Sequence, residues 1–167
     1  MALIVEDGTG RPDADSYVAV AFADQYLAAM GASAWAAASV PAREVALRKA
    51  TAYVEAAYMW RGERSSGGQA LSWPRAGVCR DGVVVASNGV PLQVQRAVCE
   101  LAAKALTVDL MPDVAPEVVT EETVGPISTS YGQARNGGLT RFSLVDSMLR
   151  GLTLAGGAGG SVRVVRA

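Results

Sequence analysis

Two tryptophans are each followed closely by an arginine, in the segments Trp60–Gly62 and Trp73–Arg75. Indole rings and guanidinium planes can stack on the bases of single-stranded nucleic acid. The same residues suit a structural role, because tryptophan is highly buried on average and arginine bonds backbone carbonyls. We expect both indoles to be largely buried, with Arg75 bonded to carbonyls or an acid and holding the loop to the second and third helices. The nucleic-acid alternative uses Trp60, Arg61, Trp73 and Arg75.

Few other residues offer chemistry. The chain has no His, which excludes Ser-His-Asp and Cys-His catalysis, His-ligated zinc and histidine pH switching. Cys79 and Cys99 are too few for a disulfide scaffold and are expected to be reduced thiols. The glycine-rich run 156–160 lacks the Lys-Ser/Thr pair of a phosphate loop. The pair Glu121-Glu122 lacks the apolar surroundings that would raise a carboxyl pKa for general acid/base catalysis. The sequence therefore predicts no enzyme, no cofactor and no metal site.

Composition predicts one compact helical domain. The chain has 167 residues, 15 basic and 16 acidic, and 50% of it is hydrophobic. Thirty of its residues are Ala, which favours closely packed helices. A net charge of −1 provides no global attraction to nucleic acid or to anionic lipid. The N-terminus lacks the basic region of a signal peptide, and no apolar run approaches a membrane span, so we expect a soluble protein made in a cytoplasm.

Hydrophobic periodicity predicts three principal helices and a short fourth. The first spans about 21–30 and the second begins at Ser39 with Pro41 in its first turn, with Leu47, Thr51, Val54 and Tyr58 on one stripe. The third runs from Pro91 to about Leu110, with Val94, Val98, Leu101, Ala105 and Val108 on one face. A capping-box-like Ser143 with Asp146 predicts the short last helix.

Two segments do not fit this helical pattern. Residues 60–90 are glycine-rich and predict a long ordered loop with a small hairpin across Asp81-Gly82. The segment 123–145 alternates weakly, with Asn136-Gly137 as a turn signal, which indicates two short strands or an open loop. The fold class is thus mainly α, with a helical domain over residues 1–150 and a flexible Gly-rich C-terminal arm over 151–167.

Several blocks carry a family resemblance over most of residues 1–150: ADSYVAV from Ala14, LRKATAYVEAAYMWRG from Leu47, QALSWPRAGV from Gln69, VPLQVQRAVCELA from Val90, and VGPI from Val124. The chain resembles a phage family labelled DnaT-like single-stranded-DNA-binding proteins, and it is similar to helical head-tail connector, or adaptor, proteins. One departure is Ala19, where such sequences tend to place Ser or Thr before the first helix. The family-signature residues are Trp60, Arg61, Gly62, Gln69, Trp73, Pro74 and Arg75.

The adaptor resemblance implies a structural virion protein in the neck of the particle, present in the host cytoplasm during assembly. It would form a homo-oligomeric ring, expected to hold twelve copies, between the portal protein and a head-closure or tail-terminator protein. Double-stranded DNA would pass through its lumen without specific binding, and no membrane is involved. The acidic balance favours this reading, because a channel that repels phosphate lets the genome slide. The alternative is a single-stranded-DNA-binding replication accessory protein.

The C-terminal arm is the expected docking element on the portal. Alternation places Val162 and Val164 on one face and Arg163 and Val165 on the other, as an added β-strand requires. Arg163 and Arg166 would pair with portal acids. The alternative is a tail with no role, since termini are often loose. The residues assigned to docking are Ser161, Val162, Arg163, Val164, Val165, Arg166 and Ala167.

Overall fold

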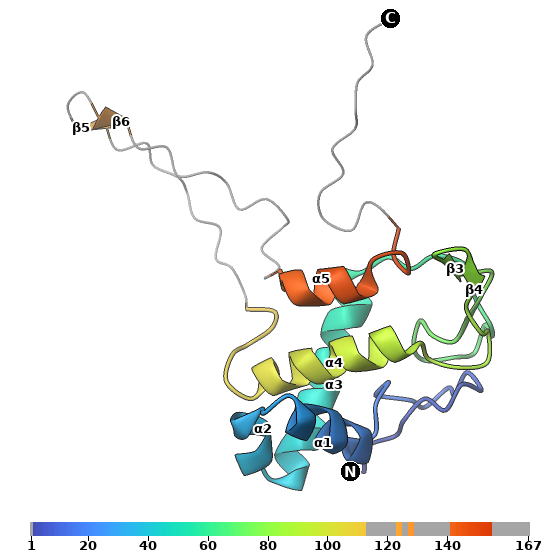
Figure 1. Cartoon of the computed structure of the whole chain (residues 1–167), viewed down its shortest axis with the longest axis horizontal. Coiled ribbons are helices and arrows are strands. Elements are labelled where there is room, and N and C mark those ends of the chain that lie inside the picture. The colour runs from blue at the N-terminus through green and yellow to red at the C-terminus, as the bar shows by residue number, and fades with distance from the viewer. Residues whose placement is uncertain (1, 113–122, 125–126, 129–140, 155–167) are drawn as a thin grey trace, which may run out of the picture.

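The computed structural model describes residues 2–112, 123–124, 127–128 and 141–154. Within these ranges the chain is mainly α-helical, as predicted, and Figure 1 shows the helices gathered into one body. The helices are α1 (Val20–Ala29), α2 (Ser33–Ala37), α3 (Val40–Ala57), α4 (Leu92–Ala105) and α5 (Ser143–Leu149). None of these described helices is long and apolar enough to cross a membrane.

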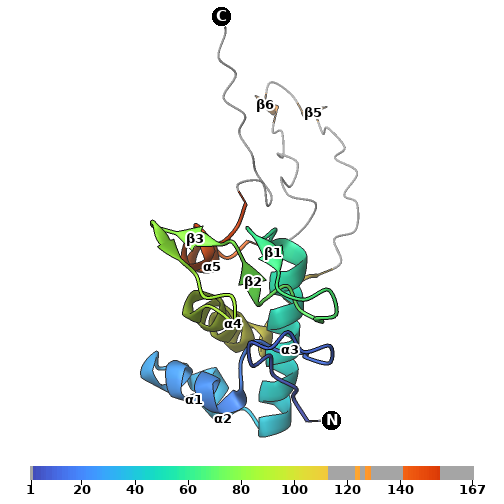
Figure 2. The ribbon, with the colours of Figure 1, turned by 90° about the vertical axis from the view of Figure 1, so that its right-hand side faces the viewer.

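Helix α3 is the central support of the body and begins where the sequence predicts. The Ser39 side chain accepts a hydrogen bond from the Ala42 backbone N–H, and Pro41 occupies the first turn. Leu47, Thr51 and Val54 are buried on the predicted stripe, which packs against α4. Figure 2 shows α1 and α2 beside one end of α3, with the strands of the long loop beside the other.

Helix α4 packs against α1, α3 and α5, and it ends earlier than predicted. Val94, Val98 and Leu101 are fully buried, whereas Val108 lies beyond the helix and is 53% exposed. The predicted end near Leu110 is wrong because residues 106–108 turn away from the helix, and the Thr107 hydroxyl donates to the Lys104 carbonyl at 3.1 Å. The same carbonyl also accepts the Thr107 backbone N–H at 3.0 Å, in the tighter three-residue pattern that often closes a helix.

Helices α1 and α2 form one end of the body. Ala19 provides no side-chain cap to α1, and Gly31, in the left-handed region at φ 71°, follows its end as predicted. Helix α2 was not predicted from the sequence, because five residues with one large side chain, Trp35, carry no detectable period. The Trp35 indole is buried, and its Nε1 donates to an Asp24 carboxylate oxygen at 2.7 Å.

Helix α5 is present, but the predicted capping box is wrong. Phe142 is the N-cap residue, Ser143 is already inside the helix, and no side chain caps the end. Asp146 instead accepts a hydrogen bond from the Tyr58 hydroxyl at 2.6 Å and pairs with Arg141 at 3.1 Å. These two contacts tie α5 to the end of α3 and to the residue that precedes the helix.

Three two-stranded antiparallel ribbons complete the described part. In the long loop, β1 (Glu63–Arg64) pairs with β2 (Arg75–Ala76), and β3 (Cys79–Arg80) pairs with β4 (Val83–Val84). The predicted hairpin at Asp81-Gly82 is confirmed, with φ of 53° and 81° as a two-residue turn of this kind requires. Strands β5 (Thr123–Val124) and β6 (Ile127–Ser128) also pair, while Asn136-Gly137 lies outside the described residues.

Residues 151–154 belong to the folded body rather than to the arm. Leu152 is fully buried, its carbonyl accepts from the Arg61 N–H at 3.0 Å, and the Leu154 N–H donates to the Met59 carbonyl at 2.8 Å. The boundary placed at Arg150 therefore falls inside the folded part of the chain. The predicted docking residues, 161–167, lie outside the described residues.

Candidate functional site

The two signature indoles are buried, as predicted. Trp73 is 0% exposed and Trp60 is 6% exposed, and their rings meet edge to face with centroids 5.7 Å apart. Neither indole N–H has a hydrogen-bond partner among the described residues. A nucleic-acid base cannot stack on either ring unless the loop first opens, so the arrangement disfavours Trp60 and Trp73 as a stacking platform.

Arg75 closes the long loop upon itself. Its guanidinium donates to three backbone carbonyls: Nε to Arg61 at 2.7 Å, Nη1 to Ser72 at 3.2 Å, and Nη2 to Gly62. The predicted bonding to carbonyls is confirmed, but the predicted attachment to the second and third helices is wrong, because all three acceptors lie in the loop. With these three hydrogen bonds, Arg75 links the segments that lead into β1 and β2, and its guanidinium has little freedom to bind a phosphate.

Glu55 attaches the long loop to helix α3. One carboxylate oxygen accepts from the Ser72 backbone N–H at 3.0 Å and from the Ser72 hydroxyl at 2.7 Å, and the other accepts from the Tyr17 hydroxyl. The Tyr17 hydroxyl oxygen in turn accepts a hydrogen bond from the backbone N–H of Trp73 at 3.1 Å. Sequence reasoning missed both residues, because Glu55 lies off the apolar stripe of α3 and Tyr17 lies within the block that begins at Ala14, and neither carries a signal of its own.

Two further polar side chains fix the loops around this anchor. Gln69 is buried, and its amide donates to the carbonyls of Leu71 and Pro74 at 2.8 and 3.1 Å. Glu6 is 4% exposed and accepts the backbone N–H groups of Gly8, Gly10 and Arg11 at 2.8–2.9 Å. Because every one of these bonds is internal, the signature block forms the interior support of the loops.

The structure explains why the motif Trp60-Arg61-Gly62 ends in glycine. Its φ is 70°, and a Cβ at this position would lie 2.2 Å from the Ala76 carbonyl oxygen. Only glycine combines the left-handed backbone with so close an approach of the opposite strand. The signature residues Trp60, Gly62, Gln69, Trp73 and Arg75 are therefore brought together by the structure in one structural role.

Alkaline pH is expected to destabilise the fold through two hydrogen-bonded tyrosines, Tyr17 of this network and Tyr26 of α1. Burial, followed by the charge of Glu55, raises the pKa of Tyr17 above its ordinary value of 10.0, and burial with a hydrogen bond to Glu100 raises the pKa of Tyr26 to about 12. The folded state holds both protons more tightly than the unfolded state. Their stabilisation is therefore complete below pH 10 and is lost as the pH rises through the raised values.

Thermal melts at neutral pH and between about pH 10 and pH 12 measure this loss, with tyrosinate absorbance recorded beside helical circular dichroism. We expect tyrosinate from Tyr17 to form only as the helix signal disappears. The Tyr17→Phe variant is the control and should show a shallower fall. Full ionisation of the tyrosines with the helices intact would contradict the placement of Tyr17.

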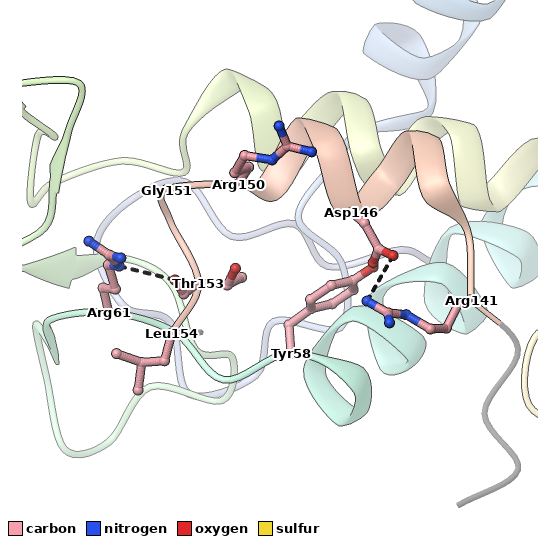
Figure 3. Close-up of a pocket in the computed structure, with 8 residues that line it drawn as sticks. All are labelled: Tyr58, Arg61, Arg141, Asp146, Arg150, Gly151, Thr153 and Leu154. Atoms are coloured by element: carbon pink, nitrogen blue, oxygen red, sulfur yellow. Dashed lines mark hydrogen bonds and ion pairs between the residues drawn. The ribbon is translucent and has the colours of Figure 1, made fainter. Parts of the chain in front are cut away.

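The surface beside this block carries an arginine-lined pocket of about 210 Å³. Arg61 and Arg141 lie at its opposite ends, with Tyr58, Thr153 and Arg150 between them (Figure 3). Arg141 pairs with Asp146, and the Arg61 Nε donates to the Thr153 carbonyl at 3.0 Å. The pocket was not predicted, because residues 61, 141 and 150 come from distant segments. Among the described residues no group of three or more metal-ligating side chains is present.

Comparison with known proteins agrees with one part of the resemblance, the DnaT-like family, and gives no match to head-tail connectors. No curated protein and no solved structure matches the chain. One family model matches residues 1–167, the whole of the sequence. The chain therefore belongs to the family described as "Putative DnaT-like ssDNA binding protein".

Proposed function

We propose that this protein is a phage head-tail connector: a structural subunit that assembles into a ring on the portal of the DNA-filled capsid. The ring extends the DNA channel and receives the head-closure or tail-terminator protein. Its place would be the neck of the virion, after a stage in the host cytoplasm. In this role the subunit needs protein-binding faces and a docking segment, and it needs no catalytic group.

The observation that carries the proposal is the exposure of apolar side chains at two separate ends of the body. On β4, Val83 and Val84 are 69% and 76% exposed, although neighbouring residues of a strand point to opposite faces. At the other end, Val40 and Val45 of α3 are 55% and 50% exposed. Figures 1 and 2 both place the β3–β4 hairpin away from α1, α2 and the start of α3.

Two different apolar surfaces are what a head-to-tail ring requires. In a closed ring each subunit presents one surface to the following neighbour and a second surface to the preceding one. A specific interface of this kind buries about 800 Å² on each partner. The buried signature block supports the same conclusion, because it leaves the two loop tryptophans inside the protein and unavailable to bases.

Single-stranded DNA binding is the second candidate, since the family description names it. The arginine-lined pocket is the surface that favours it, because Trp60 and Trp73 are buried and Arg75 is engaged by three backbone carbonyls. Such binding would depend on phosphate contacts and would weaken steeply with salt. Anisotropy of a labelled oligonucleotide, titrated at low and moderate salt, separates this candidate from the connector.

The assembly state tests the proposal. The purified subunit is expected to be monomeric or weakly associated, because its two apolar ends expose valines rather than the large aromatic anchors that dominate strong interfaces, and to form a ring only on a portal template. Light scattering of the subunit, alone and mixed with portal rings from the same genome, measures this. A stable ring without portal would contradict the templated assembly. Micromolar, salt-sensitive oligonucleotide binding without any portal binding would favour the second candidate.

A further inference from the structure

Positive charge is concentrated in the C-terminal part of the chain. Residues 141–167 contain four Arg and one Asp, whereas residues 1–140 contain 11 basic and 15 acidic residues. The arginine-lined pocket stands at the beginning of this segment, and Leu154 on its rim is the last described residue before the arm. The arm itself adds Arg163 and Arg166 and no acidic side chain.

Two guanidinium groups at the pocket have unused donors. The one carboxylate present, Asp146, is already bonded to Arg141 and to the Tyr58 hydroxyl. Arg61 donates through Nε to Thr153, and no other hydrogen bond of its guanidinium occurs among the described residues. Arg150 is exposed and has no hydrogen bond or ion pair within the described part of the chain. The pocket thus has an excess of cationic donors over acceptors.

The backbone beneath these donors is held in place. Trp60 and Thr153 form an isolated antiparallel bridge, and the Arg61 backbone N–H donates to the Leu152 carbonyl at 3.0 Å. Gly151 has φ 86°, and a Cβ there would lie 3.2 Å from the Arg80 side chain. Trp60 and Leu152 are buried below the bridge. Because this backbone is ordered before binding, only the arginine side chains lose freedom when the ligand arrives.

The chemistry of the pocket selects carboxylates on a peptide. A guanidinium fork matches a carboxylate with two parallel hydrogen bonds, and each such bond is charge-assisted. Leu154, 47% exposed, and the Tyr58 ring give the pocket apolar edges, which suit the side chains next to an acid in a peptide. At about 210 Å³ the pocket admits one or two side chains and is below the usual range of about 300–1,000 Å³ for ligand pockets.

We propose that this pocket binds an acidic segment of the portal protein through Arg61 and Arg150, next to the point where the C-terminal arm begins. The proposal rests on the connector function and adds to it a named surface and a class of partner. A partner carboxylate between these two arginines would supply the acceptors that the described part of the protein lacks.

The test uses the full-length chain and two probes: a labelled peptide of alternating Glu and Leu, and an oligothymidylate of equal formal charge. Arg61→Gln and Arg150→Gln are compared with Lys49→Gln, which removes one charge from an exposed position on α3. We expect each arginine variant to weaken peptide binding about tenfold, since a hydrogen bond to a charged group contributes ~1.5 kcal/mol or more. Lys49→Gln should bind like the unmodified chain.

Three results would overturn the proposal. The first is equal peptide binding by all three variants. The second is peptide binding that Arg150→Glu, a charge reversal at a residue without described partners, leaves intact. The third is tighter binding of the oligothymidylate that the arginine variants abolish, which would make the pocket a nucleic-acid site.

A parallel measurement with portal rings separates this proposal from the connector function. If the unmodified chain binds the rings and the arginine variants bind equally well, the pocket proposal fails and the connector function stands. If the unmodified chain does not bind the rings, the connector function fails, and the peptide titration still decides what the pocket binds. Thermal melts of each variant confirm that the fold is intact.

Discussion

Replacing Trp73 with alanine is expected to lower the free energy of unfolding by about 3–5 kcal/mol. The side chain is fully buried, packs edge-on against Trp60, and lies directly beside the backbone N–H that bonds Tyr17. Removing the indole leaves a cavity in the buried core, and Trp60 loses its edge-to-face partner. Urea unfolding followed by circular dichroism measures the loss.

The matched control for this substitution is Met59→Ala, since Met59 is 62% exposed and close in sequence to the same block. It should change stability by no more than about 0.5 kcal/mol. The three tryptophans of the chain are all buried, so acrylamide should quench the fluorescence of the folded protein only weakly. Strong quenching, or a Trp73→Ala variant as stable as Met59→Ala, would show that the loop is open and its indoles accessible.

Deleting residues 156–167 is expected to abolish recruitment to filled heads while leaving the thermal transition nearly unchanged. The described core ends at Leu152, and the backbone pairing with Met59 and Arg61 ends at Leu154, so the truncation removes none of these contacts. Docking, in contrast, would lose the strand-forming segment and two arginines. Sedimentation of heads with bound truncated or full-length protein measures recruitment.

Two further variants distinguish the means of docking. Val162→Asp places a charge on one face of the expected added strand, whereas Arg163→Gln and Arg166→Gln together remove only the charges. Loss of recruitment with the first and a partial loss with the second would indicate strand addition supported by ion pairs. Truncated protein that still assembled on heads and gave infectious particles would assign docking to the helical body.

Most helices could be predicted because their signals are local. Ser39 and Pro41 set the start of α3, Gly31 follows the end of α1, and Asp81-Gly82 specifies a turn whose backbone few other residues adopt. The end of α4 could not be placed, since the chain closes the helix with a tighter turn onto the Lys104 carbonyl several residues before the expected proline stop.

Contacts between segments far apart in the sequence were harder to predict. Burial of Trp60 and Trp73 could be expected from the residue type alone. The hydrogen bonds that hold the loop around Trp73 could not, because they depend on Glu55 and Tyr17, which are 38 residues apart. On a helical wheel Glu55 resembles any solvated acid, and only the fold places Ser72 against it. The arginine-lined pocket likewise joins the loop to residues that follow α5, so no spacing in the sequence reveals it.

Electron microscopy of DNA-filled heads, isolated without their tails and incubated with the purified protein, tests the connector function most directly. We predict additional ring-shaped density at the portal vertex alone, in a complex that then accepts tails. The same incubation with the chain lacking residues 156–167 should leave the vertex bare. Heads whose portal vertex is unchanged by the full-length protein, together with salt-sensitive binding of the protein to single-stranded DNA, would contradict the connector function.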